Sequence, residues 1–133
     1  MADIQASPFL YPILAHIAWI VFIYTLLTVV RAPDAWGIGL RADGTNPMSS
    51  YEPKITANLR NQFEWPVVFY LICVFLVIEH NTDSLQIGLA WLFIAGRLLH
   101  SYVHIFLNNI RLRGIVFSIN FVAVLGMWGV FLV

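Results

Sequence analysis

Four polar side chains lie within a stretch that is otherwise apolar enough to cross a membrane. The stretch is Lys54–Ile78, and its first half carries Arg60, Asn61, Gln62 and Glu64. A charge inside a bilayer costs about 2.5–3.5 kcal/mol on insertion scales. We therefore expect these groups to face polar partners or a water-filled cavity rather than lipid, and the identity of the partners bears on the function.

A second row of polar groups has the spacing of one helix face. The intervals along the row are three, four, four and three residues, which places all its members on a single stripe. The row consists of Arg97, His100, His104, Asn108 and Arg111. An apolar helix with one polar stripe turns that stripe toward a partner or a cavity.

Counting along the helices places the two rows opposite each other. Glu64 lies nine residues after Ile55, and Arg97 lies ten residues before Leu107. At about 1.5 Å per residue, both groups are roughly 14–15 Å from the same end of a bundle. We therefore expect Glu64 and Arg97 to form an ion pair, and Asn61 to lie level with His100.

Two interpretations of these rows remain open. The Glu64–Arg97 pair can be a structural contact that holds the helices together. The surplus of positive or titratable groups favours a binding site, because cations that line a cavity suit an anionic ligand. This surplus comprises Arg60, His100, His104, Arg111 and Arg113.

Metal and haem sites are weaker alternatives. His100 and His104 have ligand spacing, but no glutamate lies between them and no cysteine or carboxylate is nearby in the sequence. Haem held by two helices would need His16, which is at a different depth from His100. We therefore expect no metal site.

Composition indicates a membrane protein with one domain, residues 1–133. The chain is 60% hydrophobic and only 11% charged, whereas soluble domains have about 25% charged residues. Its formal net charge is zero, which gives no support for a nucleic-acid partner. Four apolar runs of membrane-spanning length predict an all-α bundle of four transmembrane helices, at about 8–31, 54–78, 84–107 and 115–133, with a kink at Pro66.

Basic residues indicate the topology. Arg31, Arg41 and Lys54 lie in or beside the first loop, and Arg111 and Arg113 lie in the third. Neither terminus nor the second loop contains Lys or Arg. The positive-inside rule therefore places the first and third loops in the cytoplasm and both termini outside.

The motifs together resemble the MAPEG superfamily, the membrane-associated proteins in eicosanoid and glutathione metabolism, and in particular its bacterial-type members. The matching segments are NLRNQFEWP, with Arg60, Asn61 and Glu64, and AGRLLHSYVH, with Arg97, His100 and His104. Arg31 and Arg113 also match, so the resemblance covers nearly the whole chain. Two positions depart from well-studied glutathione-using members, which tend to have arginine at Ala57 and often tyrosine at His104.

The resemblance implies a homotrimer in the bacterial inner membrane that binds glutathione between subunits and takes lipophilic substrates from the bilayer. Arg113 or Arg31 would stabilise the glutathione thiolate. The peptide would be held by Arg60, Asn61, Glu64, Arg97, His100 and His104. The function expected is that of a glutathione-dependent transferase or peroxidase acting on lipophilic electrophiles. The alternative is a non-catalytic trimer of the same fold that binds lipid or another anionic ligand, or acts as a partner subunit.

Overall fold

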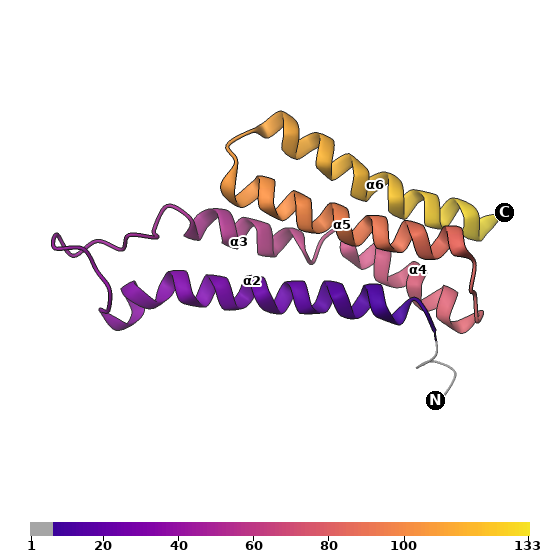
Figure 1. Cartoon of the computed structure of the whole chain (residues 1–133), viewed down its shortest axis with the longest axis horizontal. Helices are drawn as coiled ribbons and strands as arrows, with labels where there is room; N and C mark the ends of the chain where they lie inside the picture. Colours follow the sequence, from indigo (N-terminus) through magenta and orange to yellow (C-terminus); the bar gives the residue numbers. More distant parts are fainter. Residues whose placement is uncertain (1–6) are drawn as a thin grey trace.

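The computed structural model describes residues 7–133, and every regular element in this part of the chain is a helix (Figure 1). The elements are α2 (Leu10–Trp36), α3 (Glu52–Asn61), α4 (Pro66–Ile78), α5 (Ser84–Phe106) and α6 (Ile110–Leu132). Four segments are long and apolar enough to span a membrane, and α3 and α4 together make one of them, Glu52–Ile78. The predicted all-α, four-span bundle is confirmed.

Two predicted helix ends were wrong because the local signals were misjudged. Helix α2 continues through Pro33 to Trp36, and Gly37 ends it in the left-handed conformation, with φ of 66°. Helix α6 begins at Ile110 rather than near 115, because the Asn109 side chain accepts a hydrogen bond from the Leu112 amide, 3.0 Å away. Asparagine at this position satisfies one of the amides that a helix start leaves free.

The second span is broken, not simply kinked. It begins at Glu52, with Pro53 in its first turn, so two residues assigned to the first loop are helical. Proline is favoured there because a helix start has no partner for its amide. Helix α3 ends at Asn61, four residues of turn follow, and α4 starts at Pro66. The turn is visible between α3 and α4 in Figure 1.

A buried polar layer separates two apolar clusters in the bundle. One cluster joins α2, α3 and α5 around Ile23 and Ile55. The other joins α4, α5 and α6 around Phe69 and Phe93. Between them lie buried polar side chains, namely His16, Asn58, Gln62, Arg97 and Ser101. Because lipid is as apolar as the helices, polar contacts and close packing, rather than a hydrophobic driving force, hold helices together in a bilayer.

Helices α5 and α6 form the most extensive helix pair, and they approach closely at Gly96. A Cβ atom placed on Gly96 would lie well inside van der Waals contact with Oδ1 of Asn120, and 3.2 Å from its Cγ. Asn120 is fully buried and cannot swing into solvent. Glycine is therefore needed at this position for the two helices to pack as they do.

Gly96→Ala should destabilise the bundle by about 1–3 kcal/mol, because the added methyl group overlaps the Asn120 amide. Gly88→Ala, in the same helix, is the matched control, since a Cβ atom there meets nothing within 4 Å. The control should be neutral or up to about 1 kcal/mol stabilising. Thermal unfolding in detergent, followed by circular dichroism, measures both. Equal stability of the two variants would contradict the close contact.

Candidate functional site

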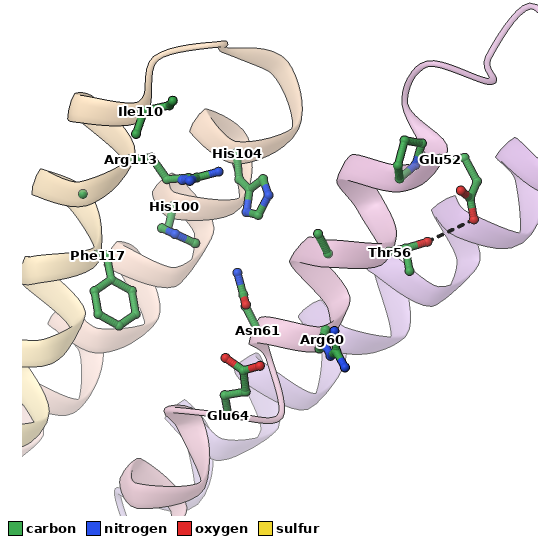
Figure 2. A pocket seen from close by; sticks show the side chains of 13 residues that line it. Glu52, Thr56, Arg60, Asn61, Glu64, His100, His104, Ile110, Arg113 and Phe117 are labelled. Atoms are coloured by element: carbon green, nitrogen blue, oxygen red, sulfur yellow. Dashed lines mark hydrogen bonds between the residues drawn. The ribbon is translucent and has the colours of Figure 1, made fainter.

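A cavity of about 1010 Å³ opens between α3 on one side and α5 and α6 on the other (Figure 2). Six of the eight residues predicted to form the site line it. They are Arg60, Asn61, Glu64, His100, His104 and Arg113. Arg97 and Arg31 are not among the lining residues. The sequence thus predicted six of the thirteen residues that line the cavity, including both of its histidines.

The broken span and the α5–α6 turn bring the polar groups of the cavity together. Asn61 and Glu64 project from the end of α3 and the turn after it toward His100 and Arg113 (Figure 2). His100 and His104 come from successive turns of α5, and their ring centres are 5.7 Å apart. Arg60 lies on the side of α3 turned away from the two histidines (Figure 2).

Arg31 makes the one ion pair found within residues 7–133, with Glu52. Its Nε and Nη2 atoms donate to Oε1 of Glu52 at 2.7 and 2.5 Å, and Nη2 also reaches Oγ1 of Thr56 at 3.3 Å. Glu52 and Thr56 line the cavity. Arg31 therefore acts on the cavity rim from α2 and neutralises one of its two carboxylates.

The expected pairing of Arg97 with Glu64 does not occur within the chain, although equal depth had favoured it. Arg97 is 1% exposed and donates from Nε to Oε1 of Gln62 at 3.2 Å, and from Nη2 to the carbonyl oxygen of Asn61 at 3.0 Å. Glu64 is exposed to the cavity. Depth placed the two groups at similar levels, but the break after Asn61 presents a backbone carbonyl to Arg97 instead.

The free polar groups of the cavity have mixed character. With Glu52 taken by Arg31, the charged residues left along the cavity are two cations, Arg60 and Arg113, and one carboxylate, Glu64. The Nδ1 atoms of His100 and His104 are buried and have no hydrogen-bond partner among the described residues. No group of three potential metal ligands occurs in residues 7–133. The arrangement suits an organic ligand with anionic groups, a cationic group and hydrogen-bonding atoms.

Sequence reasoning missed some residues of the cavity. Glu52 and Thr56 lie in the first two turns of α3, and the signal for them was Pro53, which marks a helix start. Phe117 lies on α6 with its ring centre 5.9 Å from that of His100. An aromatic residue in an apolar helix gives no sign of which neighbour it faces, so Phe117 could not be found from the sequence.

A model of the MAPEG family matches residues 9–133. The chain belongs to the MAPEG family. Searches of curated proteins and of solved structures gave no significant match. This family includes glutathione-dependent transferases and also non-catalytic members. Family membership and the four spans together make the protein a multi-pass integral membrane protein.

Glu64→Gln should change the free energy of unfolding by less than about 0.5 kcal/mol, because exposed groups away from contacts matter little. Arg97→Met should cost about 1–3 kcal/mol, because it leaves the Asn61 carbonyl without a partner. The double variant should be additive to within about 0.5 kcal/mol. Unfolding in detergent measures the cycle. A coupling above about 1 kcal/mol would show that Glu64 and Arg97 do interact.

Proposed function

We propose that this protein binds glutathione in the cavity and uses it to conjugate or reduce lipophilic electrophiles. The observation that carries the proposal is one cavity in a membrane protein of the MAPEG family, lined by Arg113, Glu64, Asn61 and two histidines. Its volume, about 1010 Å³, is at the upper end of the roughly 300–1,000 Å³ typical of ligand pockets.

The donor set matches the groups of glutathione. Glutathione has two carboxylates, one ammonium group and peptide amides, and it supplies a thiol when bound. Arg60 and Arg113 offer cations for carboxylates, and Glu64 offers a carboxylate for the ammonium group. Asn61, His100 and His104 offer hydrogen bonds to the peptide. Arg97 has no place in the wall and acts from behind it, through the carbonyl oxygen of Asn61.

Arg113 is the better of the two candidates for stabilising a thiolate. It lines the cavity close to the two histidines (Figure 2), whereas the guanidinium of Arg31 is engaged by Glu52. A cation beside a thiol lowers the thiol pKa and raises the fraction of reactive thiolate. Arg31 then has a supporting role, since it holds Glu52 and Thr56 at the rim.

The proposal includes the assembly and orientation expected of the family. The protein forms a homotrimer in the bacterial inner membrane, and lipophilic substrates and membrane lipid reach the cavity from the bilayer. The first and third loops face the cytoplasm, because the basic residues gather there. The cavity would then draw glutathione from the cytoplasm.

Arg113→Ala should lower kcat/KM for glutathione conjugation about a hundredfold, because the cation that favours the thiolate is lost. Arg111→Ala is the matched control, since Arg111 lies in the same first turn of α6 but does not line the cavity. The control should retain most of the activity. Turnover of a model electrophile or a lipid hydroperoxide by the purified protein measures both. No glutathione binding by the unmodified protein would refute the proposal.

Ala57 favours a second candidate function, a non-catalytic protein that binds lipid or another anionic ligand. Ala57 lines the cavity and adds no charge at a position where the resemblance leads one to expect arginine. A headgroup or acyl chain retained in the purified protein, together with no thiol-dependent turnover, would favour this alternative. Competition between glutathione and the retained lipid would favour the enzyme.

A cysteine at Thr45, in the first loop, should react with a membrane-impermeant maleimide only when the cytoplasmic face is accessible. The native Cys73 is buried and gives little background. Intact spheroplasts and inside-out vesicles supply the two faces, and a cysteine at Asn81 in the second loop is the control. Thr45→Cys should react in inside-out vesicles, and Asn81→Cys in spheroplasts. The reverse pattern would contradict the positive-inside orientation.

A further inference from the structure

The break in the second span replaces helical hydrogen bonds by tighter ones. The Gln62 amide donates to the Leu59 carbonyl, and the Phe63 amide donates to the Arg60 carbonyl, both at 3.0 Å. These bonds link residues three apart, as in a 3₁₀ turn, which has 3.0 residues per turn instead of 3.6. The carbonyl oxygens of Asn58 and Asn61 consequently lose the amides that a continuous α-helix would offer them.

Two side chains take the place of the missing amides. Nε2 of Gln62 donates to the Asn58 carbonyl at 3.2 Å, and Nη2 of Arg97 donates to the Asn61 carbonyl at 3.0 Å. Within a bilayer each unsatisfied backbone group costs several kcal/mol, so irregular backbone survives there only when protein groups or water satisfy it. The break therefore depends on one side chain of its own, Gln62, and on one that α5 supplies, Arg97.

The side-chain amide of Gln62 uses its full hydrogen-bonding capacity in a fully buried position. Its Oε1 atom accepts from Nε2 of His16 at 3.0 Å and from Nε of Arg97 at 3.2 Å. Its Nε2 atom lies 3.2 Å from both the carbonyl oxygen and Oδ1 of Asn58, and 3.3 Å from Oγ of Ser101, so its two hydrogens serve three acceptors. A glutamine amide has two donor hydrogens and two acceptor lone pairs, and the pattern uses them all.

These bonds also assign the tautomer of His16. Because Oε1 of Gln62 can only accept, Nε2 of His16 carries the proton. Nδ1 then accepts a hydrogen bond from the Tyr70 hydroxyl. His16 lies on α2, Tyr70 on α4 and Arg97 on α5. The Gln62 amide is thus linked, directly or through His16, to helices on both sides of the break.

Pro66 alone does not account for the break. Proline lacks an amide hydrogen, and at this position it removes the bond to the Gln62 carbonyl. The carbonyls of Asn58 and Asn61 lose their amides upstream of that point. A proline kink explains where α4 begins, whereas the end of α3 at Asn61 coincides with the Gln62–Arg97 contacts.

We propose that Gln62, Arg97 and His16 are positioning residues. They stabilise the turn between α3 and α4 and so direct Asn61 and Glu64 into the cavity. Gln62 keeps the α3 end in its tight turn, Arg97 holds the Asn61 carbonyl, and His16 fixes the Gln62 amide from α2. The inference deepens the proposed function, because Asn61 and Glu64 are residues assigned to glutathione. Its geometric part concerns the chain alone and needs no ligand.

Cysteine labelling tests the geometry without glutathione. Asn61→Cys reports the cavity, and Phe63→Cys reports the opposite, apolar groove that Phe63 lines with Tyr70. Neither substitution removes a network bond, since Asn61 contributes only its carbonyl. In open membrane fragments a charged thiol reagent should label position 61 about tenfold faster than position 63. The parent protein, with buried Cys73 alone, gives the background.

Gln62→Met keeps the side-chain length but removes every side-chain hydrogen bond of Gln62, and it should bring the labelling rates at positions 61 and 63 to within about threefold of each other. Gln86→Met is the matched control. Gln86 is also a buried glutamine, 1% exposed, and its Nε2 donates to the Met127 carbonyl at 3.0 Å, outside the network. The control should keep the tenfold ratio. A folded Gln62→Met protein with an unchanged ratio would overturn the proposal.

Arg97→Lys keeps the experiment decisive if Gln62→Met does not fold. Lysine retains the charge but has one nitrogen, which cannot reach both Gln62 and the Asn61 carbonyl as a guanidinium does. In Arg97→Lys the ratio of the labelling rates at positions 61 and 63 should also fall to about threefold. An unchanged ratio overturns the proposal.

Titration of the unmodified protein with glutathione is a separate measurement. Failure to bind there refutes the proposed function, while the labelling ratio still decides the positioning role.

Discussion

The fold depends on how the protein satisfies the backbone at the break in its second span. A carbonyl or amide without a partner is costly inside a bilayer, and the tight turn after α3 leaves the Asn58 and Asn61 carbonyls without amides. The Gln62 side chain and Arg97 supply the donors. Both are buried. The turn could not persist at this depth without a buried amide and a buried guanidinium beside it.

The same polar layer sets the register of the bundle. Gln62 contacts His16 on α2 and Ser101 on α5, and an apolar cluster lies on either side of the layer. Sliding one helix past another would move apolar groups against the glutamine and polar groups into the clusters. Fixing this register places His100 and His104 across the cavity from Asn61 and Glu64.

The charged side chains near the cavity fall into two groups, one buried in the protein and one lining the cavity. Arg97 is enclosed and bound to neutral acceptors, Arg31 is matched by Glu52, and Arg113 and Glu64 line the cavity. The enclosed arginine supports the backbone, and the charges lining the cavity can meet a ligand. This division supports the proposal that the cavity binds glutathione, in which Arg113 is the residue proposed to activate the thiol.

The sequence by itself determined the class of the protein, its four spans and six of the thirteen residues that line the cavity. Hydrophobic runs of membrane-spanning length and polar residues at helical spacing depend on local geometry, which is the same in every helix. Only the tertiary structure decided which acceptors Arg97 reaches, that Arg31 bonds to Glu52, and that the second span divides after Asn61. These outcomes depend on which groups from different helices lie within about 3 Å of one another. Equal depth could not predict the acceptors of Arg97, because the turn after Asn61 presents a backbone carbonyl and the Gln62 amide to its guanidinium.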